Sequence, residues 1–175
     1  MRVYSVGHSN LDAAAFEALV AGAGVRALVD VRRRPVSRWP WFRRDLLARR
    51  LADARIEYVW LGDGLGGLRE PKLSLAESRN RALADTALRA YADAQSEPRF
   101  ARDLEALLVL AARTPTSVMC AERDWRQCHR QILADVLVAR GCEVLHLVPG
   151  VAPELHRLSE AARVEGGTVS YPSLV

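Results

Sequence analysis

Short apolar runs alternate with longer helical stretches along these 175 residues, and this alternation constrains the fold most strongly. Strands are expected at residues 3–6, 25–29, 57–61, 116–119 and 143–148, where β-branched and aromatic residues gather. Strands separated by helices of this length pair in parallel, because a parallel connection needs a long crossover. The sequence therefore predicts an α/β fold: a single domain over residues 1–175, with a mostly parallel five-stranded sheet and helices on both faces, a Rossmann-like three-layer sandwich.

Helices are predicted between these strands from apolar residues at helical spacing and from capping residues. One begins after a cap at Ser9 or Asn10, and the others cover residues 43–54, 74–95, 99–113, 128–140 and 153–163. In the second of them, Leu46, Leu47 and Leu51 are expected to face inward. The predicted strand order, numbered along the chain, is 3-2-1-4-5, which brings the ends of the first and fourth strands together.

Polar residues follow each of the first four strands at its carboxyl end. His8 and Ser9 follow the first strand, Asp30 and Arg32 the second, Gly66 and Gly67 lie in the loop after the third, and Cys120 and Glu122 follow the fourth. Parallel α/β sheets bind ligands outside the carboxyl ends of their strands. These four placements predict one site at one edge of the sheet, with His8 near Cys120.

The stretch from Ser117 to Arg130 combines two thiols, a carboxylate, an imidazole and guanidinium groups. A hydrophobic core does not require this mixture, whereas a reaction centre does. We expect Cys120 to be a nucleophile whose pKa is lowered by Arg126 and Arg130, although a single cysteine at a strand end is more often simply buried. Cys120 and Arg126 also show the Cys-x5-Arg spacing of phosphate-transferring thiols, which we interpret as coincidental because Glu122 would repel a phosphate.

Glu122 and His129 are candidate general base and acid, with His8 and Asp30 as further catalytic candidates. Cys128 and Arg130 are expected to contact substrate. An alternative is a metal site formed by Cys120, Cys128, His129 and His8, but the irregular spacing is not that of a structural zinc site, and we predict no metal.

Asp30 and Arg32 lie on the same side of an extended chain, so they either pair with each other or act separately, with Arg32 gripping an anion. Gly66 and Gly67 are expected to approach substrate or to form only a turn. No Lys-Ser/Thr follows these glycines, so the loop is not a nucleotide triphosphate site, and we predict no cofactor.

Positive charge is concentrated between Arg32 and Arg50, where eight arginines accompany one acidic residue. Trp39, Trp41 and Phe42 interrupt this run, and aromatic rings beside guanidinium groups suit exposed bases and phosphates. Ser37 and Arg38 belong to the same segment and are candidate substrate contacts. The alternatives are a solvated face with the aromatic rings tucked under the loop, or a lid over a small anion.

The polar motifs together resemble those of the DUF488 family, a domain of unknown function. They are Gly7-His8-Ser9, Asp30-Val31-Arg32 with Pro35 and Ser37, Leu65-Gly66-Gly67, and Cys120-Ala121-Glu122 followed by Cys128-His129-Arg130, and the resemblance extends to about His146. It implies an intracellular, compact α/β domain whose polar motifs form one site. It implies no reaction.

Two function classes fit these observations. The first is a hydrolase or transferase acting on an anionic small molecule or on single-stranded nucleic acid. The second is a non-catalytic module that binds nucleic acid, with structural or metal-bound cysteines. The start of the sequence resembles no signal peptide, no apolar run is long enough to cross a bilayer, and three cysteines, of which Cys142 is interpreted as merely buried, do not suit a disulfide framework. A cytoplasmic protein without membrane partners is expected, with its oligomeric state open.

Overall fold

The computed structural model describes residues 1–173, and its main sheet has six strands in the order β3-β2-β4-β1-β5-β6. The strands are β1 (Arg2–Gly7), β2 (Ala27–Asp30), β3 (Glu57–Trp60), β4 (Thr116–Cys120), β5 (Glu143–Leu147) and β6 (Glu154–Leu155). The first five pair in parallel, and β6 adds an antiparallel edge. The predicted α/β fold with a mostly parallel sheet is confirmed, with one short strand more than expected.

The predicted strand order is wrong in one respect, because β4 lies between β2 and β1 instead of outside β1. All five residues of β4 are buried, and the strand has hydrogen-bonding partners on both sides, as suits an interior strand of a parallel sheet. β1 and β4 are adjacent both in the predicted order and in the observed one. The carboxyl ends of these two strands therefore still meet.

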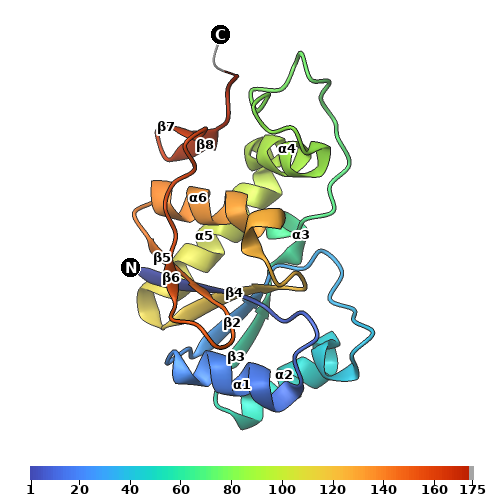
Figure 1. Ribbon diagram of the computed structural model, residues 1–175, viewed down its shortest axis with the longest axis vertical. Helices are drawn as coiled ribbons and strands as arrows, with labels where there is room; N and C mark the ends of the chain where they lie inside the picture. The colour runs from blue at the N-terminus through green and yellow to red at the C-terminus, as the bar shows by residue number, and fades with distance from the viewer. Residues whose placement is uncertain (174–175) are drawn as a thin grey trace.

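Helices cover both faces of the sheet (Figure 1). The main helices are α1 (Ala13–Gly22), α2 (Arg44–Asp53), α4 (Thr86–Asp93), α5 (Pro98–Arg113) and α6 (Arg130–Ala139). The shorter elements are α3 (Gly62–Leu65), the 3-10 turns η1 (Pro40–Phe42), η2 (Ala94–Ser96) and η3 (Trp125–Gln127), and a hairpin of β7 (Arg163–Glu165) and β8 (Thr168–Ser170). One apolar core lies between the sheet and α1 with α2, and the other between the sheet and α5 with α6. No helix among the described residues has the length and apolarity needed to cross a membrane.

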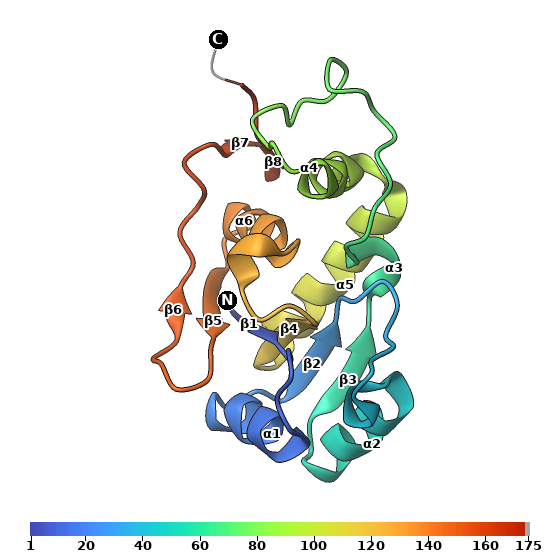
Figure 2. The ribbon, with the colours of Figure 1, turned by 45° about the vertical axis from the view of Figure 1, so that its right-hand side comes forward.

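The helix predicted over residues 74–95 is wrong for its first half, since only α4 forms there and residues 66–85 make a long excursion (Figure 2). Ser78 and Asn80 both donate side-chain hydrogen bonds to Asp93, and Asn80 also accepts from the backbone N–H of Tyr171. Short polar side chains that find such partners favour loop over helix. Asp85 caps the helix that does form, accepting from the N–H of Leu88.

Three smaller expectations also fail. Residues 153–163 form β6 and a loop instead of a helix, because β6 pairs with β5 at the edge of the sheet. The cap of α1 is Asp12, whose carboxylate accepts from the N–H of Ala15, and not Ser9 or Asn10. In α2, Leu47 and Leu51 are buried as expected, but Leu46 is 39% exposed.

Candidate active site

The carboxyl ends of β1, β2 and β4 lie side by side and carry the predicted site residues on one edge of the sheet. Gly7 at the end of β1 pairs with Cys120 at the end of β4. The N–H of His8 donates to the carbonyl of Cys120 over 3.0 Å, and the N–H of Ser9 donates to that of Ala121 over 2.9 Å. The N–H of Val31, directly after β2, donates to Met119 of β4. Hydrogen bonding between strands therefore continues into the loops that carry the polar side chains.

The two cysteines of the loop between β4 and α6 are in contact. The sulfur atoms of Cys120 and Cys128 are 3.1 Å apart, and both residues are buried, at 0% and 4% exposure. A carboxylate oxygen of Glu122 lies 3.1 Å from the Cys120 sulfur and 3.6 Å from the Cys128 sulfur. Cys142 is also buried, as expected, and all three cysteines are free thiols. The site therefore contains a hydrogen-bonded thiol pair beside a carboxylate.

The surroundings of the two sulfurs favour the thiolate at Cys128 over the thiolate at Cys120. The hydrogen bond from the Cys120 thiol lowers the pKa of Cys128 well below its usual value, and His129 and Arg130 add to this effect. Burial and the same hydrogen bond raise the pKa of Cys120 well above its usual value. The prediction that Cys120 has the lowered pKa is therefore wrong. Because Cys128 lies just before α6 and accepts from the backbone N–H of Arg130 at 3.5 Å, it gains the anion stabilisation of a helix N-terminus.

Arg130 is the buried cation of the site, with 1% exposure. Its Nε donates to the Cys120 sulfur over 3.0 Å, and its two other nitrogens donate to the hydroxyl of Ser5 and the carbonyl of Glu122 over 3.1 and 2.6 Å. Arg130 was predicted to contact substrate, but its guanidinium is occupied by the protein and instead holds the sulfur pair and the loop. Arg126, the other predicted partner, pairs with Glu154 and Asp124 at the surface.

A metal site would use donor atoms of Cys120, Glu122 and Cys128, which lie within 4.8 Å of one another. The Arg130 guanidinium already occupies the Cys120 sulfur and places a positive charge beside it. A dication in the same position would face electrostatic repulsion from this cation. The geometry therefore favours thiol chemistry over metal binding.

His129 lies between the thiol pair and the end of β2. Its Nδ1 is 3.4 Å from the Cys128 sulfur, and its Nε2 is 3.2 Å from the carbonyl of Val31. Since a carbonyl only accepts, Nε2 carries a proton, and Nδ1 faces the sulfur in a position to exchange one. Gly67 permits this placement, because a Cβ there would lie 2.6 Å from Nδ1 of His129.

Asp30 and Arg32 pair with each other, which was one of the two predicted alternatives. The guanidinium of Arg32 donates to both carboxylate oxygens of Asp30, over 2.9 and 2.6 Å, and Tyr58 donates to one of them. Arg32 also lies 3.3 Å from Nε2 of His8. Since a guanidinium only donates, Nε2 of His8 accepts, and its Nδ1–H donates to the carbonyl of Ser9.

His8 is consequently held neutral, and its ring stacks on Phe42 with centroids 4.1 Å apart. Burial, followed by the charge of Arg32, lowers the pKa of His8 to about 4. His8 and Asp30 were predicted as catalytic residues. In the structure both of them support Arg32, which lines the cavity beside the cysteines.

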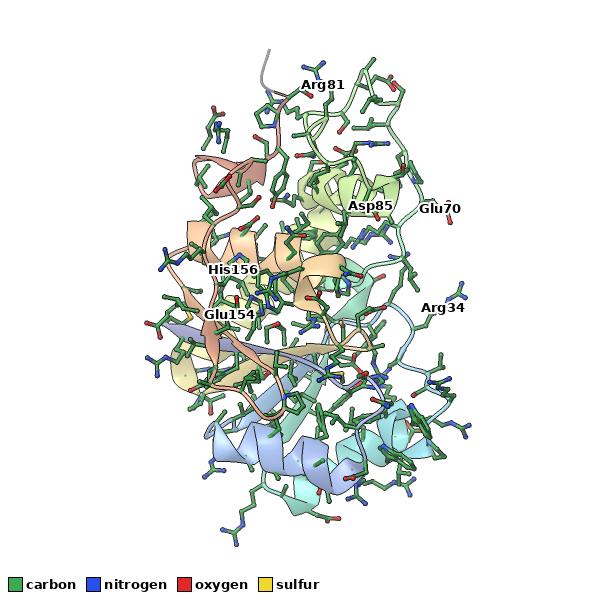
Figure 3. All side chains as sticks on the ribbon, in the orientation of Figure 1. Arg34, Glu70, Arg81, Asp85, Glu154 and His156 are labelled. Atoms are coloured by element: carbon green, nitrogen blue, oxygen red, sulfur yellow. The ribbon has the colours of Figure 1, made fainter. Side chains whose placement is uncertain are left out.

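A cavity of about 370 Å³ opens over the thiol pair. Its lining includes Cys120, Glu122, Cys128, His129, Gly67, Arg32, Arg33 and Arg34. Arg34 projects outward from the loop after β2, and Asp85 lies at the start of α4 on the opposite rim (Figure 3). Gly66 is not part of the lining, because it packs against the backbone of Arg33, where an added Cβ would lie 2.7 Å from the Arg33 Cα. Its predicted substrate contact is replaced by this packing role.

Two further hollows adjoin this cavity. One, of about 520 Å³, shares Glu122 with it and is lined by His8, Ser9, Ser37, Arg38, Trp39 and Arg123. The other, of about 420 Å³, shares Arg33 and Arg34 and is lined by Arg69, Lys72 and Arg99. We call the three together the edge groove. Two of its hollows lie at the carboxyl edge of the sheet, the third extends towards α4 and α5, and arginines line all three.

A second buried cluster was not predicted from the sequence. The ring of His156 joins Asp135 of α6 to His146 of β5 through two contacts of 2.9 Å, and Trp125 stacks on His146 with centroids 3.8 Å apart. Tyr171 donates to the same Asp135. These residues come from separate elements, and no spacing in the sequence relates them. A histidine in a predicted strand is a weak signal that could have drawn attention to His146.

The stability of the protein should fall between pH 7.5 and pH 5. The pKa of His8 is about 4 and that of His146 is about 3 in the folded state, mainly through burial, against about 6.5 in an unfolded chain. Below pH 6.5 the unfolded chain therefore binds more protons, so this stability is present above pH 6.5 and is lost as the pH falls towards 4. His8 alone should contribute about 3 kcal/mol to the free energy of unfolding above pH 6.5, and this contribution is lost once the pH falls below about 4.

Urea unfolding at pH 7.5, 6 and 5 measures this loss, and His8→Gln should reduce it. Equal unfolding free energies at pH 7.5 and 5 would show that the two histidines are not held neutral.

Comparison with protein families bears on the resemblance found in the motifs. The family model described as domain of unknown function DUF488 matches residues 12–137.

The chain belongs to the DUF488 family. The predicted resemblance is thereby confirmed, and the match contains the loop of the thiol pair, Glu122, His129 and Arg130. Gly7-His8-Ser9 and His146 lie outside the matched residues of this DUF488 chain. Comparisons with curated proteins and with solved structures gave no match.

Proposed function

We propose that this DUF488 protein is a thiol-dependent enzyme that transfers or hydrolyses a group of an anionic substrate. The observation that carries the proposal is the Cys128 sulfur on the wall of a cavity with an arginine-lined rim, where the Cys120 thiol and the backbone N–H of Arg130 donate to it and the Arg130 guanidinium lies nearby. Sulfur anions of this kind are nucleophiles, and the free thiolate is the reactive form. Cys128 is the proposed nucleophile, in place of Cys120.

The neighbouring groups fit supporting roles. Cys120 and Arg130 hold the charge of the thiolate, one by a hydrogen bond between the sulfurs and the other as a buried cation. Glu122 is exposed and reaches both sulfurs with one carboxylate oxygen, and His129 reaches Cys128 with Nδ1. Both are positioned to move a proton to or from a leaving group in the cavity. Arg33 and Arg34 line the cavity and offer their charge to an anion.

We infer that the substrate is nucleotide-like or a nucleic acid. The edge groove offers three hollows with shared lining residues, and Arg38 lies 5.1 Å from the ring of Trp39, which itself stacks on Trp41. Such a platform accepts a base, and the arginines accept phosphates. Parts of the basic segment are already engaged, since Arg43 donates to the carbonyl of Ser37 and Arg44 lies over Trp60.

Alkylation tests the proposed nucleophile. Iodoacetamide at pH 7, followed by peptide mapping, should modify Cys128 faster than Cys142, because burial raises the pKa of Cys142 whereas that of Cys128 is lowered. Addition of an anion that fills the cavity should slow the reaction at Cys128 alone. Cys128→Ser is the control for the site of labelling. Equal rates at Cys128 and Cys142 would refute the nucleophile.

A non-catalytic module that binds nucleic acid remains the second candidate, supported by the same Arg38 and Trp39 platform. Binding of a labelled single-stranded oligonucleotide, followed by anisotropy, should weaken with salt, and each phosphate contact should add about 0.7 to the log-log slope. Trp39→Ala should weaken binding by about 1–3 kcal/mol without changing the slope. Absence of binding at low salt would remove nucleic acid as the substrate and leave the edge groove for a small anion.

A further inference from the structure

The sulfurs of Cys120 and Cys128 are placed for bond formation with each other. They are 3.1 Å apart, and a disulfide requires about 2.0 Å, so a movement of about 1 Å joins them. Cys120 ends a strand, whereas Cys128 follows the irregular segment of residues 121–127, which contains η3. The Cys128 sulfur is therefore the one whose backbone can shift more easily towards its partner.

The pair is also chemically asymmetric. Cys128 faces the helix N-terminus and His129, whereas the Cys120 thiol has the carboxylate of Glu122 at 3.1 Å. Cys128 is thus arranged to attack first as a thiolate, and Cys120 to lose its proton to Glu122 in the step that follows. A nucleophile for group transfer needs only one sulfur. The second sulfur supports that reaction only as a hydrogen-bond donor, a role that a hydroxyl could also fill, whereas a second thiol adds the capacity to form a disulfide.

We propose that Cys120 and Cys128 form a redox dithiol that reduces small hydroperoxides and ends the half-reaction as an intramolecular disulfide. In the first step the Cys128 thiolate attacks the distal peroxide oxygen, a sulfur–oxygen bond forms, and the oxygen–oxygen bond breaks. The leaving alkoxide or hydroxide takes a proton from solvent in the cavity, and Cys128 becomes a sulfenic acid.

In the second step Cys120 attacks the sulfur of Cys128, the sulfur–sulfur bond forms, and the sulfur–oxygen bond breaks. The departing hydroxide leaves as water with the proton of the Cys120 thiol, which passes through Glu122. The two cysteines together give two electrons to the peroxide, one from each sulfur, so one hydroperoxide yields one alcohol, one water and one disulfide. A small dithiol restores the pair by exchange.

Burial decides the class of oxidant. Cys128 is 4% exposed and Cys120 is fully buried, so a disulfide on another protein cannot approach either sulfur in line. A hydroperoxide is small enough to enter the cavity of about 370 Å³ that both cysteines line. The redox reaction uses the same thiolate as the proposed function but requires no anionic substrate.

The test is intact-mass spectrometry of the reduced full-length protein treated with one equivalent of hydrogen peroxide at pH 7. We expect a loss of about 2 Da as two thiols become one disulfide, mapped to Cys120 and Cys128, and full reversal by dithiothreitol. Cys142→Ser should behave in the same way. Cys120→Ser should stop at a sulfenic acid on Cys128, which dimedone traps, and Cys128→Ser should not react at Cys120.

Three results would overturn the proposal: oxidation of Cys142 as fast as Cys128, a sulfenic acid in the wild-type protein that never resolves, or disulfides formed between molecules. Failure of the proposed group transfer gives a different pattern. In that case iodoacetamide and peroxide still react first with Cys128, but added anions do not slow the alkylation of Cys128.

Discussion

Replacing Arg130 by Met should lower the free energy of unfolding by about 3–5 kcal/mol, because the buried Cys128 thiolate would lose the cation beside it and three buried acceptors would lose their donor. Arg130 is 1% exposed and donates to the Cys120 sulfur, to Ser5 and to the carbonyl of Glu122. Methionine fills a similar volume but satisfies none of these acceptors. Urea unfolding at pH 7.5 measures the loss.

The same substitution has a second readout that a purely structural arginine would not change. Loss of the cation should raise the pKa of Cys128, so its alkylation by iodoacetamide at pH 7 should slow and recover at higher pH. Arg157→Met is the matched control, since Arg157 is exposed. It should change the free energy of unfolding by no more than about 0.5 kcal/mol and leave the alkylation rate of Cys128 unchanged. An Arg130→Met protein with wild-type stability would contradict the assigned role of the guanidinium.

Replacing Gly7 by Ala should destabilise the protein by about 3 kcal/mol, at the upper end of the usual cost of overpacking. A Cβ at Gly7 would lie 1.8 Å from the carbonyl oxygen of Glu122 and 2.8 Å from a guanidinium nitrogen of Arg130. The loop after β4 would have to withdraw, and the thiol pair would move with it. Thermal unfolding and the alkylation rate of Cys128 should therefore change together.

Gly22→Ala provides the control for the Gly7 substitution. Gly22 is the last residue of α1, and a Cβ there would meet nothing within 4 Å. Alanine is favoured over glycine in a helix by about 0.5–1 kcal/mol, so Gly22→Ala should be neutral or slightly stabilising. If Gly7→Ala were equally harmless, the close approach of β1 to the Glu122 loop would be refuted.

Local sequence patterns determined the fold class and the edge that carries the site. Runs such as Val118 to Cys120 with the β-branched Thr116 before them favour strands, and crossovers of helical length force parallel pairing. Parallel pairing then brings the carboxyl ends of β1, β2 and β4 to one edge without further information. His8, Asp30 and Cys120 were for this reason predictable as neighbours from the sequence.

Long-range contacts determined what local patterns could not. Ser78 and Asn80 hold the first half of the predicted helix over residues 74–95 in a loop, because their side chains form hydrogen bonds with Asp93 and Tyr171. The order of β4 and β1 depends on which of them pairs with β2, and both strands are hydrogen-bonded on both sides in either order. The cluster of Asp135, His146 and His156 exists only because α6, β5 and the segment after β6 pack together.

The site shows the same division between sequence and tertiary structure. The residue types in the loop from Cys120 to Arg130 by themselves indicated a thiol, an acid and a cation. Only the tertiary structure decided that the thiolate is favoured at Cys128, that Arg130 is enclosed by the protein and that Asp30 pairs with Arg32. Charge location depends on burial and on hydrogen-bond partners a few ångströms away, and those are properties of the packed chain and not of residue spacing.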